Sequence, residues 1–250
     1  MIWRRNSEKN IDPGASGQSF GHRLPFGYNR PNSLKGPMDL TWYGLSCFRM
    51  KERGLAIVVT DPYDPSLGLP ALNLKADLVT VSHDAAGHNY LKGVKGQRLR
   101  IMGPGEYEVG GVFITGIPMA ADSNGNNGKV PNTLYVFNFD GLTVAHLGDL
   151  AYVPSQSQIE NLGPVDVALV PVGGGGALSP AQAAEVISLV EPSLVVPMHY
   201  KTGKEKVDLG QVAKFLSEMG VGKQEPLEVL KITKSGLSDQ AQVVVLDPVT

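Results

Sequence analysis

The most informative run in this sequence is Asp77-Leu78-Val79-Thr80-Val81-Ser82-His83-Asp84-Ala85-Ala86-Gly87-His88-Asn89. Residues 78–81 are aliphatic or β-branched, which is typical of a short buried strand. The loop that follows this strand contains His83 and His88. Taken singly, two histidines in a loop of glycine and alanine are ordinary capping or loop residues. Their place at the end of a rigid strand makes them candidate metal ligands.

Two later runs have the same design. Leu142-Thr143-Val144-Ala145-His146-Leu147 is followed by Gly148-Asp149, and Leu194-Val195-Val196-Pro197-Met198 is followed by His199. The ends of different strands can bring side chains from distant parts of the sequence around one point. Neutral imidazole and carboxylate suit zinc, and also iron or manganese. The three runs together therefore predict a metal site.

The composition indicates one globular domain. The chain has 250 residues and 26.6 kDa, of which 42% are hydrophobic and 18% charged, which suffices for a full core. No run approaches the roughly 18 apolar residues of a membrane span, and the N-terminus lacks the apolar core of a secretory signal. We therefore expect a cytoplasmic protein without a membrane partner. The single cysteine, Cys47, cannot form an internal disulfide or by itself a zinc cluster, so histidines and carboxylates must hold any metal.

The charge of the chain argues against nucleic acid as a partner. A net charge of −2 and a pI near 6.2 give no general attraction for a polyphosphate backbone, so a small-molecule substrate or ligand is favoured. Residues 1–37 carry +4, which leaves −6 for residues 38–250. The first 37 residues are rich in Gly, Pro, Asn and Ser and show no periodicity, so we predict a disordered tail there. Met38, at the start of the predicted domain 38–250, is a candidate for the natural first residue.

Strand patterns dominate the first half of the domain, and helices come late. The expected strands are 39–43, 46–50, 55–60, 77–82, 98–102, 112–117, 133–139, 142–147, 166–171, 193–198, 228–232 and 241–246. Ser179, Pro180 and Gln182 predict the start of one helix. Asp208 is expected to cap a second helix that ends at Gly220, and a third is expected over 155–162. This order predicts two sheets packed face to face with helices on their outer faces.

Six short motifs carry a resemblance to a known family. They are Thr41-Trp42-Tyr43-Gly44-Leu45-Ser46-Cys47-Phe48, Thr60-Asp61-Pro62-Tyr63, Val81-Ser82-His83, Gly105-Glu106-Tyr107-Glu108, His146-Leu147-Gly148-Asp149 and Val196-Pro197-Met198-His199-Tyr200. From about Met38 to Leu246 the chain resembles the metallo-β-lactamase superfamily, in particular its branch of lactonase-like and uncharacterised bacterial metal-dependent hydrolases. The resemblance implies an α/β fold, an αββα four-layer sandwich. It also implies one or two metal ions at one edge, where an activated water attacks a carbonyl or phosphoryl centre.

The family's His-x-His-x-Asp-His signature is incomplete in this chain. Its first histidine falls on His83 and its last on His88, which places Ala85 on the second histidine and Gly87 on the aspartate. A further histidine is expected after the strand at 112–117, where this chain has Ala121. The resemblance thus implies three lost ligand positions, Ala85, Gly87 and Ala121. Leu45 also stands where the family pattern Gly-His-Ser has histidine.

The resemblance still leaves enough ligands for one metal ion. His88, Asp149 and His199 are expected to hold it, with His83 or Asp84 as a fourth ligand, and the ion is expected to be zinc, or else iron or manganese. His88 and Asp149 are the expected catalytic residues. The alternative is that the lost histidines leave the site without metal, because affinity depends on the number of oriented ligands.

Other polar residues near these motifs have supporting roles. By resemblance, Asp61 is expected to hold the ligands in place from behind, and Asp84 is a candidate for the same role. His146 lies within a strand and is expected to be a packed residue with a hydrogen-bond partner.

Two classes of function follow. The first is a metal-dependent hydrolase of a small ester, lactone or phosphorylated metabolite with at most one intact metal site. The alternative is a catalytically inactive relative that keeps the fold for ligand binding or assembly, and relatives in this branch suggest a homo-oligomer. A nuclease would need a basic channel, which the net charge of −6 does not support.

Overall fold

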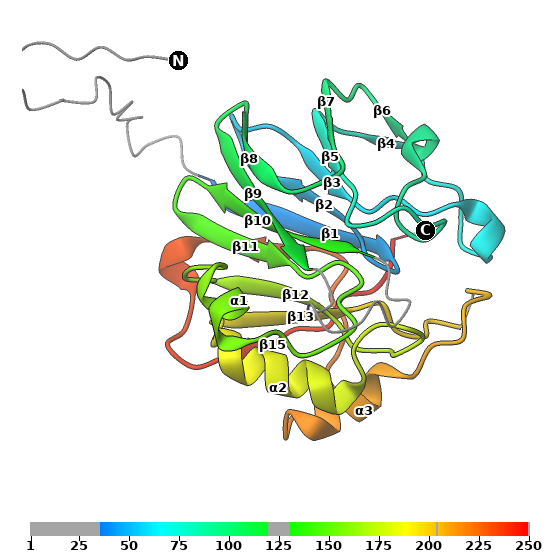
Figure 1. Ribbon diagram of the computed structural model, residues 1–250, viewed down its shortest axis with the longest axis vertical. Coiled ribbons are helices and arrows are strands. Elements are labelled where there is room, and N and C mark those ends of the chain that lie inside the picture. Colours follow the sequence, from blue (N-terminus) through cyan, green and yellow to red (C-terminus); the bar gives the residue numbers. More distant parts are fainter. Residues whose placement is uncertain (1–35, 120–130, 204, 250) are drawn as a thin grey trace, which may run out of the picture. The chain divides into compact units, whose positions relative to one another are not determined.

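Two β-sheets pack face to face in the computed structural model, which describes residues 36–119, 131–203 and 205–249 (Figure 1). All of these belong to one compact unit, Lys35–Thr250. The first strand begins at Met38. The predicted tail, apart from its last two residues, lies outside the described residues, as does Ala121.

The first sheet has six strands in the order β14-β1-β2-β3-β5-β7. Its long antiparallel strand β1 alternates buried and half-buried residues, as expected for a strand with one face on the core. The short parallel neighbours β3 and β5 are buried throughout. The bounds are β1 (Met38–Gly44), β2 (Cys47–Lys51), β3 (Val58–Thr60), β5 (Leu78–Thr80), β7 (Leu99–Ile101) and β14 (Leu230–Ile232).

The second sheet has seven strands in the order β15-β13-β12-β11-β10-β9-β8. Strands β8 to β11 form an antiparallel meander, and β11, β12, β13 and β15 run parallel. The carboxyl ends of β11, β12 and β13 therefore lie at one edge. The bounds are β8 (Gly105–Val109), β9 (Val112–Met119), β10 (Asn132–Phe139), β11 (Leu142–His146), β12 (Val167–Pro171), β13 (Leu194–Met198) and β15 (Gln242–Val243).

The main core lies between the two sheets. Its largest fully buried side chains come from both of them and include Trp42, Phe48, Tyr135, Phe137 and Phe139. Trp42 and Phe48 stack with their ring centroids 6.3 Å apart. This apolar layer makes the sandwich rigid behind the edge at which the predicted metal ligands emerge.

The α-helices come from the part of the chain that forms the second sheet. They are α1 (Gln156–Glu160), α2 (Pro180–Val190) and α3 (Val212–Glu218), and α2 and α3 lie on the outer side of β12, β13 and β15 (Figure 1). Ser179 caps α2 in a capping box with Gln182, as predicted. Among the described residues, no helix is long and apolar enough to cross a membrane.

The predicted cap of α3 at Asp208 is wrong, because the N-cap is Gln211. The backbone between Asp208 and Gln211 makes hydrogen bonds to other segments instead of starting the helix. The Gly210 N–H donates to the Gly173 carbonyl at 2.7 Å, and the Gly210 carbonyl accepts from the Lys201 N–H at 2.8 Å. These bonds tie Gly210 to neighbouring segments, so the helix begins after it.

The outer face of the first sheet is covered without α-helices in the described residues. The segment between β3 and β7 forms two 3-10 turns, Pro65–Leu67 and Leu91–Gly93, and a small separate sheet of β4 (Leu74–Lys75) and β6 (Val94–Lys95). A second apolar cluster fills this layer and includes Leu45, Cys47, Tyr63, Leu69, Val79 and Val94. The fold is the expected α/β sandwich of two central sheets, but the expectation of helices on both outer faces is wrong for the first sheet, whose outer layer in the described residues consists of turns and a small sheet.

Candidate metal centre

Four strand ends meet at one edge of the sandwich. Asp61 follows β3, His83 follows β5, Asp149 follows β11 after a short turn, and His199 follows β13. The first two come from one sheet and the last two from the other. His88 reaches the same place from the loop after His83.

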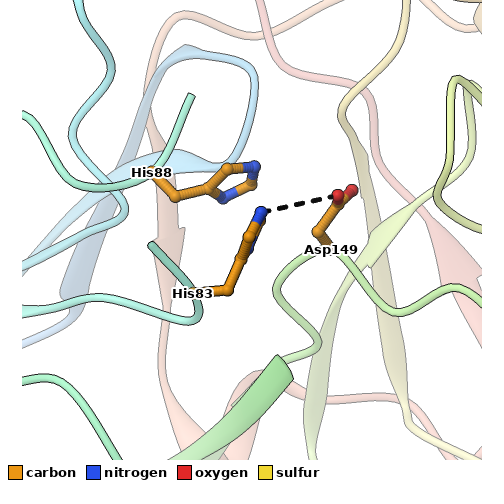
Figure 2. Close-up of side chains that lie close together, drawn as sticks. All are labelled: His83, His88 and Asp149. Atoms are coloured by element: carbon orange, nitrogen blue, oxygen red, sulfur yellow. Dashed lines mark ion pairs between the residues drawn. The ribbon is translucent and has the colours of Figure 1, made fainter. Parts of the chain in front are cut away.

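His83, His88 and Asp149 are close enough to share one metal ion. Each contributes one ligand atom to a group in which all distances are within 4.8 Å. The His83 Nε2 atom lies 3.8 Å from Asp149 Oδ2, and the centroids of the two imidazole rings are 4.1 Å apart. Figure 2 shows the two imidazoles and the Asp149 carboxylate directed toward one another.

His199 approaches Asp149 from β13. Its Nδ1 atom lies 3.8 Å from Asp149 Oδ1, and its ring centroid is 5.7 Å from that of His88. The residue has a φ of +52°, an uncommon conformation for a non-glycine residue. Its N–H donates to the Leu45 carbonyl at 3.0 Å, and its carbonyl accepts from the Gly173 N–H at 3.1 Å. These bonds hold the backbone in the turn that presents the imidazole to Asp149.

Two polar atoms between these residues lack hydrogen-bond partners. His199 Nδ1 and Asp149 Oδ1 are both buried, and neither has a partner within residues 36–119, 131–203 and 205–249. An unpaired buried polar atom is costly, and such atoms in a functional site often face an ion or a water molecule. This pair fits a metal ion held between the imidazole and the carboxylate.

Asp61 lies behind His88 and is fully buried. Its carboxylate accepts hydrogen bonds from the Ser82 N–H at 2.7 Å, the Ser82 hydroxyl at 2.6 Å and His88 Nδ1 at 2.8 Å. Because a carboxylate accepts this bond, His88 carries a proton on Nδ1, which leaves Nε2 as its atom for a metal. Asp61 thus contacts His88 from behind, where it can hold the imidazole ring in place.

The titration behaviour of the site follows from burial and from these partners. Burial lowers the pKa of His199 to about 4. Burial and the neighbouring His88 lower the pKa of His83. Burial would also lower the pKa of His88, but its hydrogen bond to Asp61 and the charges of Asp61 and Asp149 raise it above its ordinary value. His83 and His199 are therefore neutral near pH 7, as metal ligands must be.

We expect protonation of His199 to cost the metal-free protein stability as the pH falls from about 6.5 to about 4. The pKa of His199 lies near 4 in the folded state and near its ordinary value of about 6.5 in the unfolded state. The unfolded chain therefore binds this proton first, and the cost in free energy of unfolding reaches about 3 kcal/mol. Urea unfolding in EDTA between pH 4 and 8 measures it. A His199→Gln variant should lose less stability over this range, and parallel pH curves for the two proteins would contradict the assignment.

Two polar residues that the sequence analysis named, His146 and Asp84, lie outside the group formed by His83, His88 and Asp149. His146 is fully buried in the core: its Nε2 donates to the Ser46 carbonyl at 2.9 Å, and its Nδ1 accepts from the Gly148 N–H at 3.2 Å. The prediction of a packed histidine with hydrogen-bond partners is confirmed. Asp84 is exposed and accepts a hydrogen bond from the Asn89 side chain. Among the described residues, its carboxylate is outside the group formed by His83, His88 and Asp149.

Apolar side chains flank one of the positions where the resemblance implied a lost ligand. A Cβ atom on Gly87 would lie 3.6 Å from Leu45 Cδ1 and 3.9 Å from Leu67 Cδ1. Leu45 itself stands where the family pattern has histidine. Leucine side chains therefore lie next to Gly87, where the family pattern has an aspartate.

The sequence did not single out two residues that support the cluster. The Ser82 hydroxyl lies 3.4 Å from the Nδ1 atoms of both His83 and His88. The Asn132 side chain binds the turn that carries Asp149. The only sequence signal for Ser82 is its place before His83, and Asn132 has none, because its role depends on the pairing of β10 with β11.

Comparisons with known proteins agree with the fold. Residues 39–199 match a family described as the beta-lactamase superfamily domain. A UPF0173 metal-dependent hydrolase of Methanoculleus marisnigri is 33% identical over 66% of this chain and 82% of the relative. A UPF0173 metal-dependent hydrolase of Thermococcus kodakarensis is 27% identical over 76% of this chain and 89% of the relative. The solved structure of a proposed zinc-dependent hydrolase of the metallo-beta-lactamase superfamily from Thermotoga maritima has 37% identity and a TM-score of 0.68, covering 84% of this chain and 98% of that one.

Proposed function

The chain belongs to the beta-lactamase superfamily and to its UPF0173 group of metal-dependent hydrolases, and we propose that it hydrolyses a small ester, lactone or phosphorylated metabolite with one metal ion. The observation that carries this proposal is the convergence of His83, His88, His199 and Asp149 from both sheets. The proposal is also supported by the buried atoms His199 Nδ1 and Asp149 Oδ1, which have no hydrogen-bond partner among the described residues.

The donor set suits a divalent ion. His88, Asp149 and His199 would hold it, with His83 as the fourth ligand, and three imidazoles with one carboxylate favour zinc over iron or manganese. Such an ion supplies Lewis-acid chemistry, since it polarises a carbonyl or phosphoryl oxygen and lowers the pKa of water.

The chain's own residues orient the reactants. The Asp149 side chain is 24% exposed, so solvent reaches it, while one of its oxygens faces His83 and the other faces His199. It can therefore orient a water molecule and accept its proton. His88 is buried and its Nδ1 is held by Asp61, which leaves Nε2 as the atom that would bind the metal, with the metal taking the place of any proton there.

Elemental analysis of untagged protein purified without added metal tests the proposal. We expect near one equivalent of zinc, iron or manganese, and a loss of most of it in His199→Ala, because the ligand set falls from four to three. The parent protein should then hydrolyse members of a panel of lactones, esters and phosphoesters, with turnover abolished in the variant. Asp84→Ala is the control, since this aspartate is exposed outside the ligand group, and it should retain its metal.

The residues Leu45, Ala85 and Gly87 favour a second candidate, a relative that keeps the fold for ligand binding or assembly without catalysis. None of them can coordinate a metal through its side chain. If the parent and the His199→Ala variant both hold far less than one equivalent of metal, this second candidate replaces the hydrolase. Light scattering on the same samples would then determine whether the chain assembles with itself.

A further inference from the structure

We propose that Asn132 is a positioning residue that fixes the Asp149 carboxylate in the metal site, an inference that rests on the proposed function. Asn132 is the first residue of β10 and is 7% exposed. Its Oδ1 atom accepts from the Asp149 N–H at 3.1 Å, and its Nδ2 atom donates to the Leu147 carbonyl at 3.1 Å. One amide side chain therefore binds both ends of the turn Leu147-Gly148-Asp149.

The turn is confined from both sides. Gly148 has a φ of +58°, and a Cβ atom there would overlap Asn132 Oδ1 and lie 2.6 Å from Ser82 Cβ. Only glycine fits between Asn132 and Ser82 with this backbone conformation. The turn carrying Asp149 thus packs directly against the amide that bonds it.

The start of β10 also binds the other half of the site. The Thr133 N–H donates to the Ser82 carbonyl at 2.8 Å, next to His83. Ser82 follows β5 in the first sheet, whereas Asp149 follows β11 in the second. The pair Asn132-Thr133 therefore links the two ligand-bearing strand ends across the sandwich, which fixes the spacing between His83 and Asp149.

The Asp149 carboxylate has little else to hold it. Its Oδ1 atom has no hydrogen-bond partner in the described part of the chain, and its two histidine neighbours lie 3.8 Å away. Its position is consequently set by its backbone, which Asn132 holds at Leu147 and Asp149 while His146 holds Gly148 between them. A residue that orients a metal ligand in this way commonly changes metal affinity 10- to 100-fold when it is lost.

Zinc and cobalt titrations of Asn132→Ala test this role. We expect a 10- to 100-fold weaker zinc affinity and a shifted visible absorption spectrum of the cobalt form, which reports the arrangement of the ligands. The matched control is Asn138→Ala. Asn138 lies on the same strand about 20 Å away, and its Oδ1 accepts from the Gly141 N–H at 2.9 Å. This control should lose stability without a change in zinc affinity or in the cobalt spectrum.

A second variant keeps the test decisive if Asn132→Ala folds poorly. Asn132→Asp keeps an acceptor for the Asp149 N–H but turns an oxygen instead of an N–H toward the Leu147 carbonyl, so we expect its zinc affinity to fall below that of the parent, and a parent-like affinity would overturn the inference. Parent-like zinc affinity and cobalt spectra in a folded Asn132→Ala protein overturn the inference and leave the proposed function intact. A parent protein that binds neither ion overturns both.

Discussion

Replacing Gly173 by alanine is expected to lower the free energy of unfolding by more than about 4 kcal/mol, or to prevent folding. A Cβ atom at this position would overlap the His199 carbonyl oxygen and lie 2.8 Å from Tyr200 Cα. Both obstacles are backbone atoms, so no side-chain rotation relieves the clash. The Gly173 N–H donates to the His199 carbonyl, and the Gly173 carbonyl accepts from the Gly210 N–H at 2.7 Å. Any movement that makes room breaks these bonds and displaces His199.

Urea unfolding of Gly173→Ala measures this effect, with Gly222→Ala as the control. A Cβ atom on Gly222 would meet nothing within 4 Å, so its replacement should change the free energy of unfolding by about 0.5 kcal/mol or less. A Gly173→Ala protein within about 1 kcal/mol of the parent would show that the backbone at His199 yields more easily than its packing indicates.

The sequence predicted most of the sheet architecture because the core strands carry strong patterns. Leu194–Met198 and Val167–Pro171 are continuous apolar runs buried throughout, and Met38–Gly44 alternates. It missed the edge strand Gly105–Val109, whose residues are exposed or half-buried and include two glutamates. That strand is defined by its pairing with β9 rather than by burial, so its own composition gives little signal.

The residues of the candidate site likewise fall into those that the sequence could predict and those that it could not. His83, Asp149 and His199 could be predicted to meet because each follows an apolar run, and strand ends gather at one edge. Asn132 and the cap of α3 could not be predicted, because both depend on hydrogen bonds between segments far apart in the sequence. Asn132 binds Leu147 and Asp149, and Gly210 binds Gly173 before the helix begins.

Replacing Asp61 by alanine is the second change with a large expected effect. The fully buried carboxylate accepts hydrogen bonds from Ser82 and His88. Its removal leaves three buried donor groups without their acceptor, so we expect the free energy of unfolding to fall by about 3 kcal/mol or more. We also expect zinc affinity to fall 10- to 100-fold, because His88 loses the partner that orients its ring. Urea unfolding in EDTA and zinc titration measure the two effects separately.

Asp61→Asn separates the role of the charge from that of the shape. An asparagine fills the same space and accepts from the Ser82 N–H, but its amide group next to His88 donates to Nδ1 instead of accepting from it. The His88 proton must then move to Nε2, and the lone pair that faces the ligand set is lost. We therefore expect a smaller loss of stability than in Asp61→Ala but an equally large loss of zinc affinity.

The proton position on His88 can be observed directly by nitrogen NMR of the imidazole, which should report Nδ1–H in the parent protein and Nε2–H in Asp61→Asn. Asp64→Asn is the matched control, because Asp64 is outside the site and its carboxylate accepts from the Ser66 N–H. It should change neither the tautomer nor the zinc affinity. If Asp61→Asn binds zinc as tightly as the parent, His88 does not hold the metal through Nε2, and the remaining ligands His83, Asp149 and His199 must suffice without it.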